Sequence, residues 1–264
     1  MSSRRMKVSL VDLHSAEGGR AVDELFAFHV LSPFMRGGSH EGDGHAALVI
    51  PGLLAGDRST EDLRDLLQAR GYNAFGWEQG RNYGPRPGVE DRLLAQLNRL
   101  HAAYGPVSLI GWSLGGLYAR ELAKRAPDCV RQVITLGSPI GRADEAAPHA
   151  SRVFKFLNGT MDPARLLELQ HPPPVPLTAV FSKSDGVCGW EACLQEQTRH
   201  AESVEIHGSH LGLGHNLAVV HVICDRLAQP VGDWRPFEPG ALWRWAFPFR
   251  EEAMSPACDA PRGT

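Results

Sequence analysis

The sequence has little lysine and no excess of positive charge. Only four of its 27 basic residues are lysine, and 30 acidic residues bring the formal net charge to −3. Proteins that bind nucleic acid usually carry a basic excess or a face rich in lysine and arginine. We therefore expect no nucleic-acid partner for this chain.

Long apolar runs are also missing. No stretch reaches the roughly 18 uninterrupted apolar residues that a membrane-spanning helix needs. The basic N-terminus is followed by an apolar run that Asp12 interrupts, which is too early for the core of a signal peptide. These observations predict a cytoplasmic protein.

The five cysteines are too few, and odd in number, for the disulfide framework of a small secreted domain. Cys188 and Cys193 are close enough in the sequence to form a pair, although a cytoplasmic location favours free thiols. Histidine or cysteine pairs at the spacing of structural zinc ligands are absent. We expect neither a metal ion nor a cofactor.

The chain is rich enough in apolar residues to build a large core, with 43% hydrophobic and 22% charged residues in 264. From residue 45 onward, strand-like segments alternate with helix-like segments. The predicted strands cover residues 46–50, 72–77, 107–110, 131–136, 177–181 and 203–206. The predicted helices run from Ser59 to Gly71, over 89–104, from 114 to about 125 and over 216–229. This alternation predicts an α/β fold with a mainly parallel central sheet and helices on both faces.

We expect one domain over residues 1–264, with three segments outside the alternating pattern. Residues 1–44 form an N-terminal extension with a predicted helix over 21–31 and a glycine-rich loop. Residues 138–176, which end in a proline-rich run, form a short lid-like insertion. Residues 231–264 hold three of the six tryptophans and are predicted to pack over the domain; the alternative is a contact with a lipid interface or a second subunit.

The segment Gly111–Gly116 reads Gly-Trp-Ser-Leu-Gly-Gly and lies between a buried strand and an amphipathic helix. A serine at such a turn has a strained backbone that presents its hydroxyl at the carboxyl edge of the sheet, and Gly111 and Gly115 let strand and helix approach. The helix N-terminus also directs N–H groups at developing negative charge. Ser113 is therefore predicted to be a nucleophile, with a tight structural turn as the alternative.

This motif resembles the nucleophile elbow of the α/β-hydrolases, and the resemblance covers about residues 45 to 230. Residues 111–119 are similar to the elbow of bacterial carboxylesterases. Residues 181–190 and 208–213 look more like the acid and histidine loops of bacterial lipases. The resemblance implies the α/β-hydrolase fold and a serine esterase or lipase with a short lid.

A serine hydroxyl needs a base to take its proton and an acid to orient that base. In this family the acid follows a late strand. Asp185 lies four residues past the predicted strand that ends at Phe181, and we assign it as the acid. Asp162 and Asp144, both in the insertion, are the alternatives.

The histidine of this family follows the last strand. Three histidines qualify, namely His207, His210 and His215. The resemblance favours His210, and glycines at positions 208, 212 and 214 suggest enough slack to bring its ring to Ser113. His215 is the alternative.

Two backbone N–H groups are expected to form the oxyanion hole. One belongs to Leu114, directly after the nucleophile, and the other to Leu53, in the loop after the first strand. Family members commonly carry His-Gly where this chain has Pro51-Gly52. A backbone donor needs no particular side chain, so the hole is expected to survive that difference.

Apolar side chains near these motifs suit an acyl chain or an aromatic ester. We predict that Leu54, Trp112 and Trp190 bind the substrate. The predicted function is hydrolysis of small-molecule carboxylic esters through an acyl-enzyme on Ser113. An acyltransferase or thioesterase with the same triad is the first alternative, and a non-catalytic binding module on the same fold is the second.

Overall fold

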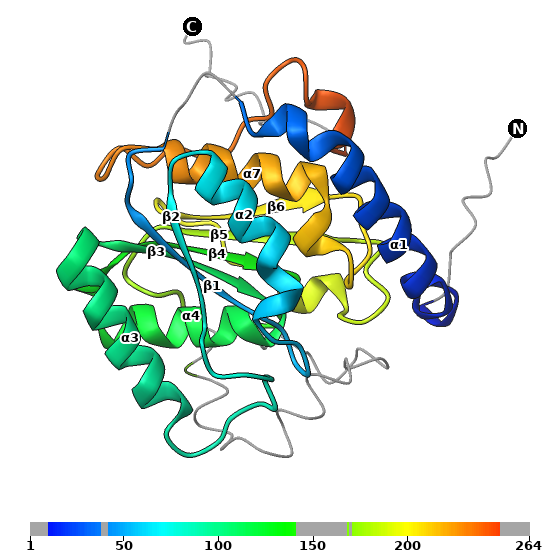
Figure 1. The fold of residues 1–264 in the computed structure, drawn as a ribbon. Coiled ribbons are helices and arrows are strands. Elements are labelled where there is room, and N and C mark those ends of the chain that lie inside the picture. Colours follow the sequence, from blue (N-terminus) through cyan, green and yellow to red (C-terminus); the bar gives the residue numbers. More distant parts are fainter. Residues whose placement is uncertain (1–9, 38–41, 141–167, 169–170, 249–264) are drawn as a thin grey trace, which may run out of the picture.

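The computed structural model describes residues 10–37, 42–140, 168 and 171–248. It contains a six-stranded sheet in the order β2-β1-β3-β4-β5-β6, and every neighbouring pair is parallel (Figure 1). The strands are β1 (Ala46–Ile50), β2 (Asn73–Gly76), β3 (Val107–Trp112), β4 (Val130–Leu136), β5 (Leu177–Ser182) and β6 (Ala201–Ile206). The predicted parallel sheet is confirmed, and each predicted strand lies within a few residues of its place.

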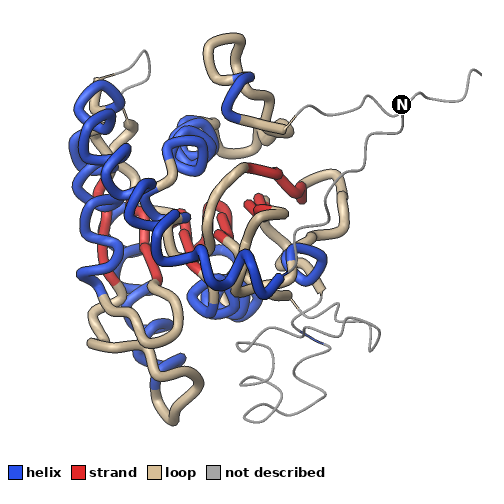
Figure 2. The backbone as a smooth tube through the Cα atoms, turned by 90° about the vertical axis from the view of Figure 1, so that its right-hand side faces the viewer, coloured by secondary structure: helices blue, strands red, loops and turns tan. Residues whose placement is uncertain are grey.

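Helices cover both faces of the sheet, as predicted. On one face lie α3 (Val89–Tyr104) and α4 (Leu114–Arg125), and on the other α2 (Glu61–Ala69) and α7 (Leu217–Ala228) (Figure 1). In the view turned by 90°, the strands are enclosed between helices (Figure 2). Because both faces are covered, strands such as β1 are buried along their whole length and read as continuous apolar runs.

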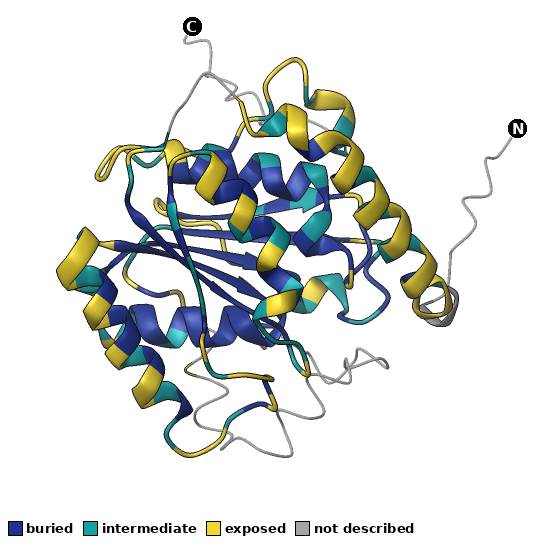
Figure 3. Ribbon diagram, viewed as in Figure 1, coloured by how far each residue is buried: buried dark blue, intermediate teal, exposed yellow. Residues whose placement is uncertain are grey.

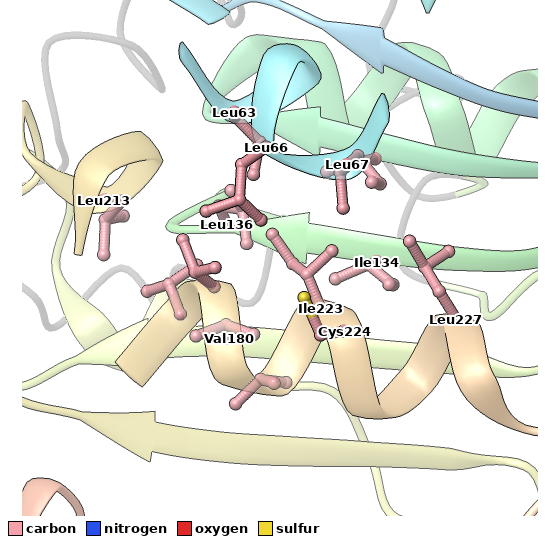
Figure 4. Close-up of a cluster of buried hydrophobic side chains, with 14 of the residues drawn as sticks. Leu63, Leu66, Leu67, Ile134, Leu136, Val180, Leu213, Ile223, Cys224 and Leu227 are labelled. Carbon is pink, nitrogen blue, oxygen red and sulfur yellow. The ribbon is translucent and has the colours of Figure 1, made fainter. Parts of the chain in front are cut away.

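The second face has its core between α2 and α7. Three leucines of α2 point toward α7, whose Ile223 and Leu227 point back across the gap (Figure 4). Ile134 of β4 and Val180 of β5 form the floor of this cluster. The contact fixes α7, and with it the loop that joins β6 to α7.

The N-terminal helix is longer than predicted. Helix α1 spans Leu10–Met35 rather than residues 21–31, and Pro33 lies in its last turn. It lies outside α2 and α7 and is exposed along its outer side (Figures 1 and 3). That outer side carries Val22, Phe26 and Phe34, whereas Glu17 is buried. Phe28 is buried on the inner side, but the exposed apolar residues and the buried Glu17 interrupt the apolar stripe from which the extent of a helix could be predicted.

The C-terminal segment folds over α7 as far as residue 248. The ring of Trp243 stacks on His221 with centroids 4.5 Å apart, and Phe237 is buried. The N–H of Phe237 donates a 2.8 Å hydrogen bond to Glu202, which also pairs with Arg226 at 2.9 Å. Most of the predicted lid, including Asp144 and Asp162, and the last 16 residues lie outside the described residues. Within the described part of the chain, no helix is long and apolar enough to cross a membrane.

Candidate active site

Ser113 occupies the turn between β3 and α4. Its φ of 53° and ψ of −119° lie in a region that residues with a Cβ seldom adopt, so the backbone is strained there. A Cβ at Gly111 would lie 2.4 Å from the backbone of Gly116, and one at Gly115 would lie 2.2 Å from the carbonyl oxygen of Ile50. Both glycines are therefore required for the close approach of strand and helix that the sequence suggested.

Asp185 follows β5 and is buried. Its Oδ1 accepts hydrogen bonds from the N–H groups of Val187 (2.8 Å) and Cys188 (2.7 Å). Its Oδ2 lies 2.6 Å from Nδ1 of His210, which donates to it when that nitrogen carries the proton. Because one oxygen is held by its own loop, the other is fixed for the histidine.

His210 follows β6, and the segments next to Ser113 contact its loop. The indole Nε1 of Trp112 donates a 3.1 Å hydrogen bond to the carbonyl oxygen of His210. The N–H of Ser113 donates to Leu136 at 2.8 Å, and a Cβ on the next residue, Gly137, would lie 3.1 Å from Nδ1 of His210. Among the described residues Ser113 Oγ has no hydrogen-bond partner; catalytic hydrogen bonds are often completed only when substrate binds.

The charge state of His210 depends on its buried surroundings. Burial alone would lower the pKa of the imidazole, but its charge interaction and hydrogen bond with the Asp185 carboxylate oppose burial and raise it above 6.5. The hydrogen bond with Cys193 and complete burial raise the pKa of the Cys188 thiol, so this thiol is neutral. Asp185 is therefore the charge that stabilises the imidazolium. Cys188 and Cys193 are both free thiols.

The structure separates His210 from its two competitors. Nε2 of His215 lies 3.2 Å from Asp62 of α2, and its ring meets Phe28 edge-to-face. His207 is exposed at the end of β6. Of the three, only His210 contacts Asp185.

The glycines of the histidine loop do not provide slack. None of the three at positions 208, 212 and 214 has a positive φ. A Cβ at Gly214 would lie 2.9 Å from the ring of Trp112, and one at Gly212 would lie 1.6 Å from Oε2 of Glu24. They are glycines because the loop is tightly packed on both sides, which corrects the explanation drawn from the sequence.

The loop after β1 lies against the nucleophile. A Cβ at Gly52 would be 3.2 Å from Cβ of Ser113. A turn is closed by the hydrogen bond from the N–H of Ala55 to the carbonyl of Gly52 (3.2 Å), and Leu53 lies within it. Leu114 is the first residue of α4, so its N–H belongs to the first helical turn, which lacks intrahelical partners. The two residues predicted to supply the oxyanion donors are thus sequence neighbours of Gly52, which lies against Ser113, and of Ser113 itself.

The three predicted substrate-binding side chains differ in accessibility. Leu54 is 60% exposed beside the Gly52 turn. Trp190 is half-buried and stacks on Phe181 with centroids 6.0 Å apart. Trp112 is almost fully buried, and its ring lies against Gly214 beneath the histidine loop. Its contacts in this structure are with the protein.

A search of protein-family models finds no match for this sequence, and a search of curated proteins finds none either. Solved structures do match. A structure of the metagenome-derived lipolytic enzymes LipS and LipT aligns with a TM-score of 0.52 at 12% identity, over 71% of this chain and 95% of that one. A lipase-esterase related protein from Clostridium acetobutylicum gives 0.51 at 17% identity over 70% and 97%. A pyrethroid hydrolase from Sphingobium faniae gives 0.50 at 18% identity over 70% and 98%. This chain has the α/β-hydrolase fold.

Another Ser–His–Asp set lies at the amino-terminal ends of β1 and β3, whereas Ser113 follows the carboxyl end of β3. Nε2 of His45 lies 2.9 Å from Oγ of Ser108, and its Nδ1 is paired with Asp43. Ser108 is fully buried inside β3, where its Oγ also accepts a hydrogen bond from Gln132 at 3.3 Å. No substrate can reach that hydroxyl, so this set is a structural hydrogen-bond network.

Two carboxylates near the active site were not predicted from the sequence. Glu17 and Glu24 project from α1 into the loops that carry Asp185 and His210. An isolated glutamate on a helix is normally solvated, and nothing in the local pattern distinguishes these two. The only trace in the sequence is the glycine content of the loops that receive them.

Proposed function

We propose that this protein is a serine hydrolase that cleaves carboxylic esters through an acyl-enzyme on Ser113. The observation that carries the proposal is the strained turn at Ser113 on the same sheet edge as the buried Asp185–His210 pair. Strain of this kind persists where the surrounding structure enforces it, and it is concentrated at functional sites.

In the first half of the reaction, Ser113 Oγ attacks the ester carbonyl carbon while its proton passes to Nε2 of His210. The Asp185 carboxylate holds the imidazole through Nδ1 and stabilises its charged form. The N–H groups of Leu53 and Leu114 donate hydrogen bonds to the tetrahedral oxyanion. The C–O bond to the alcohol then breaks, and the alcohol leaves with the proton from His210.

In the second half, His210 takes a proton from water, and the resulting hydroxide attacks the acyl-enzyme. The same N–H donors stabilise the second oxyanion. When the bond between the acyl carbon and Ser113 Oγ breaks, the proton returns to Oγ and the carboxylic acid is released. These steps use only residues of this chain and water.

Ester cleavage is favoured by what surrounds the nucleophile. Gly52 lies against Ser113, and the exposed Leu54 follows two residues later, which supports an apolar contact surface for the substrate there. The solved structures that match include lipolytic enzymes and a pyrethroid hydrolase, which supports the same class of chemistry.

The test compares two serines that each belong to a Ser–His–Asp set. Ser113→Ala is expected to lower the turnover of p-nitrophenyl esters by about 10⁴-fold or more and to abolish labelling by a fluorophosphonate. Ser108→Ala is the matched control: it removes a partner of His45, which we expect to cost about 1–3 kcal/mol of stability without loss of labelling. Labelling that survives in Ser113→Ala would disprove the proposal. A series of acyl chain lengths assayed on the wild type then defines the substrate class, and product analysis with added alcohol detects acyl transfer.

A further inference from the structure

One carboxylate on the N-terminal helix holds both catalytic loops. Oε1 of Glu17 accepts hydrogen bonds from the N–H of Gly186 (2.7 Å) and from the N–H of His210 (3.2 Å). Oε2 accepts a third from the N–H of Leu211 at 3.1 Å. Gly186 directly follows Asp185, so this single side chain joins the acid loop to the backbone of the histidine. It is only 2% exposed.

Other residues of α1 reinforce the same attachment. Glu24 accepts a 3.0 Å hydrogen bond from the N–H of Ser209 and a 2.9 Å bond from the side chain of Asn216, the residue that caps α7. Arg20 donates to the carbonyl oxygen of Ser184 at 2.7 Å. The residues on either side of Asp185 and His210 are thus held by polar side chains of one helix.

The two loops are shaped to receive this helix. A Cβ at Gly186 would lie 2.5–2.6 Å from the backbone of Leu13 and His14. One at Gly208 would lie 2.8 Å from Glu24, and one at Gly212 still closer. None of these glycines has a positive φ, so their lack of a side chain provides space for α1 rather than an unusual backbone.

The direction of the polar contacts argues against a helix that merely covers apolar surface. The exposed side of α1 carries Val22, Phe26 and Phe34, whereas the side chains that enter the protein near the triad are charged. A buried carboxylate is costly unless it is paired and hydrogen-bonded. Arg20 lies 3.9 Å from Oε1 of Glu17, and the three hydrogen bonds that Glu17 accepts come from the two catalytic loops.

We propose that Glu17 is a positioning residue that fixes the Asp185 loop against the histidine loop and thereby sets the geometry of the triad. This inference rests on the proposed function, because it needs His210 to act as the base. Glu17 itself touches no reacting atom. It acts through the backbone N–H of His210 and of the residue after Asp185, where a small displacement is costly to catalysis.

The test uses three variants of full-length protein: Glu17→Ala, Glu17→Gln and Asp23→Asn. Gln keeps the size of Glu17 but replaces one acceptor oxygen with a donor, which faces an N–H. Asp23 is an exposed carboxylate on the same helix and serves as the control. Active sites are counted by fluorophosphonate labelling, so kcat is expressed per labelled serine. Melting temperature and the pH dependence of kcat are measured beside it.

We expect kcat per labelled site to fall about 10- to 100-fold in Glu17→Ala and less in Glu17→Gln, with KM changed less than about threefold. The acidic limb of the pH profile should move to lower pH in both, because a loosened Asp185 stabilises the imidazolium less. Asp23→Asn should match the wild type within about twofold.

A purely structural role predicts a different pattern. If the Glu17 variants melt at lower temperature but keep wild-type kcat per labelled site and an unchanged pH profile, the positioning role is wrong. If Glu17→Ala does not fold, Glu17→Gln decides by the same measurements. If the wild type is not labelled at Ser113 at all, the proposed function fails and this inference with it; that result is distinct from a labelled wild type with unaffected Glu17 variants.

Discussion

At the scale of single residues, the backbone distinguishes the proposed nucleophile from a structural serine. Ser108 has a histidine at 2.9 Å that is itself paired with an aspartate, yet it lies inside strand β3 with no exposed surface. Ser113 has a φ of 53° and precedes a helix N-terminus. The residue types at the two sites are the same, although only Ser108 is hydrogen-bonded to its histidine. The strained turn at a helix N-terminus is what suits Ser113 to the proposed acyl transfer.

The choice of histidine is the first prediction at this scale. His210→Ala should lose nearly all esterase activity, because its ring is the one paired with Asp185. His215→Ala should keep at least about a tenth of it, a barrier cost of about 1.4 kcal/mol or less, since His215 pairs with Asp62. The measurement is kcat/KM on a p-nitrophenyl ester. The reverse result would assign the base to His215.

The pH dependence of activity is the second. A general base must be neutral to accept a proton, and the Asp185 carboxylate raises the pKa of His210 above 6.5 against the opposing effect of burial. Activity should therefore be full at alkaline pH and decline as the pH falls through a value above 6.5. In Asp185→Asn the acidic limb of the residual activity should move to a lower pH than in the wild type, because the charge that raises the pKa of His210 is gone. A wild-type profile of kcat/KM with its acidic limb at or below 6.5 would contradict this assignment.

At the scale of elements, the sequence predicts the sheet well because parallel strands buried on both faces must be continuous apolar runs. Helices α3 and α7 were predicted within a residue of each end, since each has one apolar face and a clear stop. Helix α1 was predicted too short, and the role of Glu17 was missed, for one reason. Partners some 170 to 190 residues away pair with its acidic residues, and no local pattern records such contacts.

The approach of β3 and α4 gives a prediction at this scale. Gly115→Ala should destabilise the protein by about 1–3 kcal/mol and reduce activity, because the added Cβ would meet the backbone of β1 at 2.2 Å. Gly19→Ala is the control, since nothing lies within 4 Å of its added Cβ and alanine favours a helix. Urea denaturation of both variants checks the difference, and equal midpoints would show that the elbow accommodates a side chain.

At the scale of the whole molecule, the buried network of Asp43, His45 and Ser108 predicts that acid lowers the stability of the fold. Burial alone would raise the pKa of Asp43, but hydrogen bonds from His45 and Arg131 lower it from 3.8 to about 2. Burial lowers the pKa of His45 below 6.5, despite its pairing with Asp43. Both shifts make the fold more stable at neutral than at acid pH, because the unfolded chain binds more protons than the folded one as the pH falls.

Stability should accordingly decline in two ranges, below pH 6.5 as the unfolded state protonates at His45 and at His215 and His221, whose pKa values burial also lowers, and from pH 3.8 toward 2 through Asp43. Urea midpoints between pH 8 and 2 measure the decline. The Asp43→Asn variant should still lose stability below pH 6.5, but it should lack the further decline between pH 3.8 and 2. A variant that declines like the wild type below pH 3.8 would assign that loss to other carboxylates.

The attachment of α1 to the catalytic loops also has a consequence for the order of events during synthesis. The helix precedes the loop with His210 by about 190 residues, so it leaves the ribosome well before that loop. Contacts between such distant segments form late, because closing a long loop costs entropy before the contacts contribute any favourable free energy. We expect the sheet of a nascent chain to form before the chain becomes active. In a refolding experiment, ester cleavage should appear after the helical circular-dichroism signal has returned. Such a delay would keep an incomplete enzyme from acting on esters in the cell.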